Sequence, residues 1–89
     1  MRLDKFLKVT RLAKRRTAAK DALDAGRIEI GGRPAKASHQ VAPGDALLIH
    51  YATRDLRVRV VAVPERIGRD LDPQALYEVI SESRTDGAP

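Results

Sequence analysis

Lysine and arginine crowd the first twenty residues of this 89-residue chain. Eight of these twenty residues are basic, whereas Asp4 is the only acid among them. The other 69 residues carry nine basic and eleven acidic side chains, so the net charge of +5 has its source in the N-terminal segment. Positive charge concentrated in this way is typical of a surface that binds a polyanion. The eight residues are Arg2, Lys5, Lys8, Arg11, Lys14, Arg15, Arg16 and Lys20.

No other set of residues has the types and spacing of a catalytic or metal site. His39 and His50 lie eleven residues apart and have no acidic or cysteine partner at metal-ligand spacing. Ser38 adjoins His39 without the arrangement of a nucleophile and its base. Asp70 and Asp72 flank a predicted helix start, where capping is their ordinary role. We therefore expect neither an enzyme nor a bound metal or cofactor.

Composition restricts the remaining function classes. The length gives one small domain, and a hydrophobic content of 43% is typical of a folded chain. The three aromatic residues, Phe6, Tyr51 and Tyr77, are too few for a base-stacking platform. The absence of cysteine excludes disulfides and thiolate zinc sites. We expect a soluble cytoplasmic protein, because the chain lacks a long apolar run and its first residues lack the apolar core of a signal peptide. We also expect a monomer.

An amphipathic helix is expected to present the basic residues. At 100° per residue, an apolar and a basic stripe fall on opposite sides of a helix that continues to about residue 13. The apolar stripe contains Leu3, Phe6, Leu7, Thr10 and Ala13, and the basic stripe contains Lys8, Arg11 and Arg15, with Asp4 among them.

Asp4 has two possible roles on this face. It lies four residues before Lys8, so the two can form a helical ion pair worth a few tenths of a kcal/mol, and an acid also favours the start of a helix. Alternatively, Asp4 holds Lys8, Arg11 or Arg15 in the geometry that a folded RNA requires. The sequence leaves both roles open.

A second helix is predicted from Thr17, whose hydroxyl suits the N-cap, to Gly26, which suits the left-handed residue after a helix. The two helices then form a hairpin whose junction at residues 14–16 holds the densest charge in the chain. The apolar side of the second helix contains Ala18, Ala19, Ala22 and Leu23.

From Arg27 the hydrophobic period changes from that of a helix to that of a strand. Strands are predicted at residues 27–30, 33–37, 46–49 and 56–63, with a tight turn at Gly31-Gly32. Asp72-Pro73 predicts the start of a closing C-terminal helix. The fold class is α+β: one domain over residues 1–83 and a flexible tail over 84–89. The buried stripe of the closing helix is expected to be Ala75, Leu76, Val79 and Ile80.

RNA is the favoured partner of the basic face. Charge runs are usually solvated helix faces, but here almost no acid opposes the cations, and basic character continues at Arg27, Arg33 and Lys36. A membrane-surface role is disfavoured, because the apolar stripe is needed for the core. DNA reading is disfavoured because the helix lacks Asn and Gln. Recognition should therefore depend on the backbone and shape of folded RNA.

A set of landmarks recurs in fixed order over the first half of the chain. They are Arg2-Leu3-Asp4, Arg11, Arg16-Thr17, the Ala-Gly-Arg-Ile-x-Ile segment at 25–30, Gly32, Lys36 and Pro43-Gly44-Asp45. This pattern resembles the αL RNA-binding motif of a small-subunit ribosomal protein, which pseudouridine synthases and bacterial tyrosyl-tRNA synthetases share. The resemblance implies a two-helix hairpin packed on a small antiparallel sheet over about residues 1–50.

The first seventeen residues, the short length and the segment Leu76-Tyr77 look closer still to the RqcP (YabO-like) family of bacterial ribosome-associated quality control. That resemblance implies a non-enzymatic factor that binds obstructed large ribosomal subunits. Its implied partners are large-subunit rRNA, peptidyl-tRNA and the RqcH (NEMF-like) factor, which adds alanine to the nascent chain. The resemblance carries over Arg2, Asp4, Arg11 and Arg16 as RNA-facing residues.

The charge argument alone adds Lys8, Arg15 and Lys20 to the candidate RNA-binding residues. Two other functions stay open. One is large-subunit recycling, as in the similar heat-shock ribosome-binding family, whose long basic C-terminal extension has no counterpart here. The other is an accessory RNA-binding domain that serves an RNA-modifying enzyme.

Overall fold

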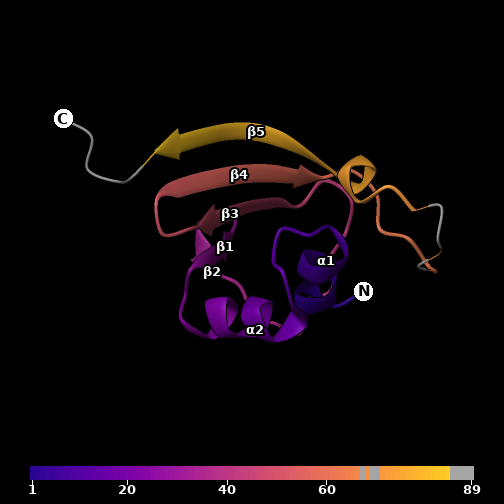
Figure 1. Ribbon diagram of the computed structural model, residues 1–89, viewed down its shortest axis with the longest axis horizontal. Helices are drawn as coiled ribbons and strands as arrows, with labels where there is room; N and C mark the ends of the chain where they lie inside the picture. The colour runs from indigo at the N-terminus through magenta and orange to yellow at the C-terminus, as the bar shows by residue number, and fades with distance from the viewer. Residues whose placement is uncertain (67, 69–70, 85–89) are drawn as a thin grey trace.

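The computed structural model describes residues 1–66, 68 and 71–84, and these form two helices beside one antiparallel sheet. The strand order in the sheet is β2-β1-β3-β4-β5. In Figure 1 both helices lie below the sheet, and β5 forms its upper edge. This arrangement confirms the predicted α+β class and the αL motif. The elements are α1 (Leu3–Val9), α2 (Arg16–Asp24), β1 (Ile28–Ile30), β2 (Arg33–Pro34), β3 (Ala46–His50), β4 (Arg54–Val60), a 3₁₀ turn η1 (Pro73–Leu76) and β5 (Tyr77–Arg84).

Backbone groups from a distant loop fix the start of α1. The Leu3 N–H donates to the carbonyl oxygen of His39 at 2.8 Å, and the Asp4 N–H donates to that of Ala37 at 3.3 Å. The Lys5 N–H donates to the Asp4 carboxylate at 2.8 Å. Three N–H groups that have no partner within the helix are therefore satisfied. The first residues of the chain are tied to the 37–39 segment, which holds Asp4 in place.

The prediction that the first helix continues to about residue 13 is wrong. The helix ends at Val9, and the buried Thr10 hydroxyl donates to the carbonyl oxygens of Phe6 and Leu7 in its last turn. Arg11 follows in the left-handed conformation with a φ of 62°, which turns the chain. Ala13 and Arg15 therefore lie in the corner between α1 and α2, and they do not belong to the stripes of the first helix in which they were predicted.

The second helix lies close to its predicted position. It begins at Arg16, after the extended residue Arg15, so Thr17 lies inside the helix and is not its N-cap. The helix ends at Asp24, and Gly26 has the expected positive φ of 75°. Of the predicted apolar side, Ala19 and Leu23 pack into the core, whereas Ala22 is half-buried and Ala18 is exposed.

The core lies between the helices and one face of the sheet. The α1 stripe of Leu3, Phe6 and Leu7 is almost fully buried, as the periodicity predicts. Along β4 the buried residues alternate with exposed ones, so the opposite face of the sheet is polar. The hydrophobic side chains contributed by the strands are Ile28, Leu47, Ile49, Leu56, Val58 and Val60.

The predicted closing helix is also wrong. Asp72 does cap a turn, since its carboxylate accepts the Gln74 N–H at 3.0 Å, and Pro73 occupies the first position. The turn ends at Leu76, however, and the chain continues as β5, antiparallel to β4. Val79 and Ile80 are 55% and 43% exposed, so they form no buried stripe.

Two further strands differ by more than one residue from their predicted bounds. β2 contains only Arg33 and Pro34, which pair with Ile30 and Glu29 of β1. The Ala35 N–H adds one hydrogen bond to the Ile28 carbonyl at 2.9 Å, after which the chain leaves the sheet. β4 begins at Arg54 and ends at Val60, earlier than the predicted 56–63. Gly31 and Gly32 have φ values of 60° and 80°, which fits the predicted tight turn. Arg84 belongs to β5, and the rest of the predicted tail lies outside the described residues.

Candidate RNA-binding surface

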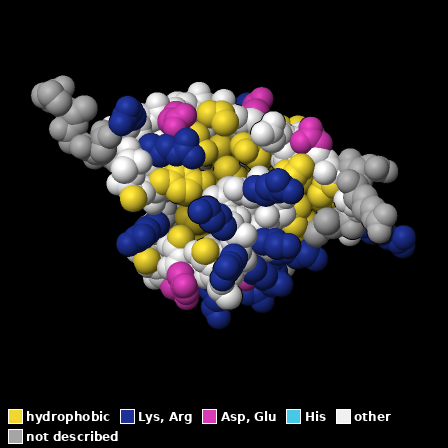
Figure 2. Space-filling model, viewed as in Figure 1, with side chains coloured by type: hydrophobic (Ala, Val, Ile, Leu, Met, Phe, Trp, Pro, Cys, Tyr) yellow, Lys and Arg dark blue, Asp and Glu magenta, His cyan; other side chains and the backbone are white. Residues whose placement is uncertain are grey.

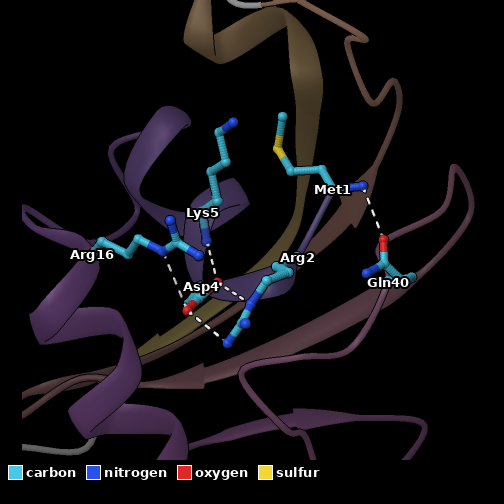
Figure 3. Close-up of polar contacts among 6 residues, drawn as sticks. All are labelled: Met1, Arg2, Asp4, Lys5, Arg16 and Gln40. Carbon is cyan, nitrogen blue, oxygen red and sulfur yellow. Dashed lines mark hydrogen bonds and ion pairs between the residues drawn. The ribbon is translucent and has the colours of Figure 1, made fainter.

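Asp4 lies at the centre of a cluster with two arginines (Figure 3). Its carboxylate accepts from Arg2 Nε at 3.3 Å and Arg2 Nη2 at 3.4 Å. Arg16 Nε lies 3.3 Å from the same carboxylate. The Asp4 side chain is only 4% exposed, whereas those of Arg2 and Arg16 are 47% and 51% exposed. The buried acid therefore orients two arginines that remain open to solvent.

The surroundings of Asp4 keep it ionised. Burial favours the neutral acid, but the hydrogen bonds from Arg16 and from the Lys5 N–H, with the charges of Arg16 and Arg2, outweigh burial. The pKa of the Asp4 carboxyl is therefore lower than its ordinary value of 3.8. Asp4 is a permanent anion at neutral pH, suited to holding cations in fixed positions.

The partners of Asp4 differ from those that the helical wheel suggests. We expected Lys8, Arg11 or Arg15, whereas the contacts are with Arg2, at the N-cap of α1, and Arg16, at the start of α2. The second contact is tertiary and depends on the turn between the helices. Two sequence signals pointed to these residues: the single acid among eight cations, and the landmarks Arg2-Leu3-Asp4 and Arg16-Thr17; neither showed that the three side chains meet.

The N-terminus is fastened beside this cluster. The terminal ammonium of Met1 donates to Gln40 Oε1 at 3.2 Å, as Figure 3 shows. The Val41 N–H donates to the Met1 carbonyl at 3.0 Å. Because its neighbours on both sides are held, Arg2 is positioned by the backbone as well as by Asp4.

The remaining predicted residues are all exposed and lie around the helix corner. Lys8 and Arg11, together with Lys14, line a shallow hollow of about 530 Å³ beside Leu71 and Pro73. Of the other two, Arg15 is the N-cap that precedes α2, and Lys20 lies within α2 one turn after Arg16. Figure 2 shows Lys and Arg side chains gathered over the region of the two helices. We call Arg2, Lys8, Arg11, Arg15, Arg16 and Lys20 the N-terminal basic surface.

The sheet holds the corner of this surface in place. Leu12 is buried, and its carbonyl oxygen accepts a 2.6 Å hydrogen bond from the Tyr51 hydroxyl. Arg11 precedes Leu12 in its left-handed conformation, so its direction is fixed by the backbone. Sequence reasoning did not connect Tyr51 with the basic segment, because the two lie 39 residues apart.

Both histidines have acidic partners that local spacing did not reveal. His50 Nδ1 lies 2.8 Å from Asp55 Oδ1, and His50 Nε2 contacts Glu29 Oε2. His39 Nε2 lies 3.1 Å from Asp45 Oδ2. The hydrogen bonds to Glu29 and Asp55 raise the pKa of His50 above 6.5, against the effect of burial.

The described residues contain no cluster of three or more His, Cys, Asp or Glu side chains arranged to hold a metal ion. Asp70, which we expected to cap a helix beside Asp72, lies outside them. Within the same residues, no helix has the length and apolar character needed to cross a membrane.

A family model for the S4 domain matches residues 1–47, more than half of the chain. The fold and this match define the class: the chain belongs to the S4 domain family. Proteins named RQC P-site tRNA stabilizing factor are similar over nearly the whole length. The *Bacillus subtilis* (strain 168) protein is 43% identical over 84 residues, with 94% of this chain and 96% of the relative covered. The chain therefore belongs, more narrowly, to the RQC P-site tRNA stabilizing factor family.

Two further relatives bear the same name. The *Halalkalibacterium halodurans* protein is 45% identical, with 92% of each chain covered. The *Streptococcus pneumoniae* protein is 41% identical, with 97% of each chain covered. A solved structure, trimeric heat shock protein 15 of *Vibrio cholerae*, has a TM-score of 0.79 over 89% of this chain and 80% of its own. At 24% identity this last likeness concerns the fold alone.

Proposed function

We propose that this protein is a non-enzymatic RNA-binding factor of ribosome-associated quality control. It binds obstructed large ribosomal subunits in the cytoplasm, contacts their rRNA and the peptidyl-tRNA together, and stabilises the tRNA while the RqcH tailing factor adds alanine residues. Relatives named RQC P-site tRNA stabilizing factor, at 41–45% identity over nearly the full chain, support this proposal.

The observation that carries the proposal is the pair of arginines held by a buried acid. Phosphate binding by a mobile arginine costs side-chain entropy, which a prior contact to Asp4 removes. Arg16 uses Nε in that contact, so its terminal nitrogens can grip a phosphate. Arg2 and Arg16 approach the same carboxylate, and so they present two cations at a fixed separation. Such a pair suits the regular backbone of folded RNA.

The test is co-sedimentation with purified large subunits that carry peptidyl-tRNA. Arg16→Ala should abolish association at a moderate cost in stability, and the fold should stay intact because Arg2 and the Lys5 N–H still bond the Asp4 carboxylate. Arg57→Ala is the matched control, since it removes the same charge from an exposed position on β4. Normal association of the Arg16 variant, or equal loss in both variants, would remove Arg16 from the site.

A deletion strain separates the proposed role from the alternatives. Loss of alanine tails on stalled chains supports a role in tailing. Intact tails with impaired recycling of large subunits favour the heat-shock type of function. Intact tails with altered rRNA modification favour a domain that serves a modifying enzyme.

A further inference from the structure

A groove of about 480 Å³ opens beside the N-terminal basic surface. It lies between the α1–α2 corner, one side of α2 and the turn that joins β3 to β4. Small apolar side chains leave it open, and Tyr51 forms part of its wall. Figure 2 shows apolar side chains exposed between Lys and Arg side chains on the face toward the viewer. The alanines of the groove are Ala13, Ala18, Ala19, Ala22 and Ala52.

The rim of the groove is positively charged. Arg11, Lys14, Arg27 and Arg54 all line it, and none of the lining residues in the described part of the chain is Asp or Glu. Glu82 pairs with Arg54 at 2.7 Å and balances part of that charge. The occupant that best complements this groove therefore combines an apolar body with negative charge.

Two planar groups are already fixed at the groove. The Tyr51 hydroxyl is held by the Leu12 carbonyl at 2.6 Å, and the Arg54 guanidinium lies 4.9 Å from the centre of the Tyr51 ring. Aromatic rings and guanidinium planes are the surfaces on which unpaired RNA bases stack. Because both are held before binding, stacking would cost little further entropy.

We infer that this groove receives an unstacked nucleotide of single-stranded RNA, with the base against Tyr51 and the alanines and the phosphate at Arg11 and Lys14. The inference rests on the proposed RNA-binding function and extends its site to the β3–β4 turn. It adds one base contact to the backbone and shape recognition that the aromatic-poor sequence predicts. One aromatic residue, placed by the fold beside four cations, is sufficient for one base.

The experiment uses the full chain labelled at alanine methyl groups and observed by NMR. The probes are hexaribonucleotides of A, C or U, an abasic ribose-phosphate hexamer of equal charge, and an amphipathic Glu/Leu peptide. At least one base-containing hexamer should shift the methyl signals of Ala18 and Ala22, and the abasic hexamer should not. Ala18→Leu should fill the groove and weaken hexamer binding about tenfold, with no effect on the abasic probe.

Ala25→Leu is the matched control, because Ala25 is exposed at the end of α2 and does not line the groove. It should bind every probe as the unmodified protein does. Equal methyl shifts with the abasic hexamer, or no shift with any hexamer, would overturn the inference. Shifts with the acidic peptide alone would make the groove a protein-docking site instead. If subunit association still requires Arg16 in those cases, the proposed function survives without the groove.

Discussion

At the scale of single residues, Asp4 is a positioning residue. It is buried, ionised and in contact with two arginines from different parts of the basic segment. Replacing a charged partner in such a cluster has a moderate cost when the remaining charges reach water, as Arg2 and Arg16 do. The effect on RNA binding should be larger, since both arginines lose their fixed direction together.

We therefore predict that Asp4→Asn destabilises the fold by about 1–2 kcal/mol. Large-subunit association should fall at the same time. Urea unfolding and co-sedimentation measure the two effects, and Asp21→Asn on the exposed side of α2 is the control. Normal subunit association of the Asp4 variant would show that orientation of the two arginines is unimportant.

The lowered pKa of Asp4 sets the pH range in which this stabilisation acts. A lowered pKa in the folded state gives stability that is present above the unfolded value of 3.8 and is lost as the pH falls through the folded value. The difference in unfolding free energy between the wild type and Asp4→Asn should be constant from about pH 7 to 5 and shrink only below about pH 4. A difference that already shrinks near pH 6 would contradict the assignment.

Replacing Arg11 with glycine should change the stability of the fold and the strength of RNA binding in opposite directions. A non-glycine residue at a φ of 62° is strained, so Arg11→Gly should raise the unfolding free energy by about 0.5–1 kcal/mol. The same change removes one cation and should weaken RNA binding. Lys8→Gly also removes a cation, but it lies inside α1 and should destabilise by about 1 kcal/mol. Thermal denaturation distinguishes the two, and equal destabilisation would contradict the strain argument.

At the scale of elements, His50 connects three strands. Its ring lies on β3 between Glu29 of β1 and Asp55 at the start of β4. The two carboxylates raise the pKa of His50, so this contact stabilises the fold fully below the unfolded value of 6.5. The contribution is lost as the pH rises through the folded value.

We predict that the wild type gains stability relative to His50→Gln as the pH falls from about 8.5 to 6. The measurement is the difference in melting temperature at each pH. Glu29→Gln, which removes one partner and keeps the ring, should reduce the pH dependence partly. A pH-independent difference would show that the histidine contributes by packing and not by charge.

The elements that sequence reasoning predicted well are those decided locally. The apolar stripe from Leu3 to Leu7 and the glycines at 26, 31 and 32 follow from spacing and backbone freedom. The end of α1 coincides instead with the left-handed Arg11, and β5 depends on pairing with β4, which starts 23 residues earlier. A run such as Tyr77–Arg84 suits helix or strand until its partner is known.

The candidate site likewise has some features that are decided locally and others that depend on residues distant in sequence. Clustering of charge in the sequence is enough to predict the N-terminal basic surface. The Arg16 contact of Asp4, the position of Tyr51 under the corner and the nearby groove all join residues distant in sequence, so only the fold reveals them.

At the scale of the whole molecule, charge is asymmetric, with Lys and Arg gathered over the helices (Figure 2). Binding through about five phosphates should make affinity fall with salt at a log–log slope of roughly −3.5 to −4.5. Titrations of large subunits at increasing potassium chloride concentrations measure the slope. Lys20→Ala, which removes one exposed cation of the N-terminal basic surface, should reduce the size of the slope by about one contact. A salt-insensitive affinity would contradict an electrostatic surface.

β5 is an edge strand of the sheet, so it is a place where two copies of the chain could pair. Val79 and Ile80 are partly exposed on this edge strand, and such edges can pair between copies. We predict that the chain is nevertheless a monomer, because the strand carries Glu78, Glu82 and Arg84 among its apolar residues. Sedimentation equilibrium at rising protein concentration measures the mass, and a stable trimer would contradict this prediction.

The most direct test of the central claim is crosslinking of the tagged protein to RNA in cells, followed by sequencing of the recovered RNA. We predict large-subunit rRNA together with tRNA, and no enrichment of small-subunit rRNA. Loss of both signals in Arg16→Ala, with retention in Arg57→Ala, would assign them to the N-terminal basic surface. Recovery of small-subunit rRNA, mRNA or scattered RNA would contradict a role on split subunits that carry peptidyl-tRNA.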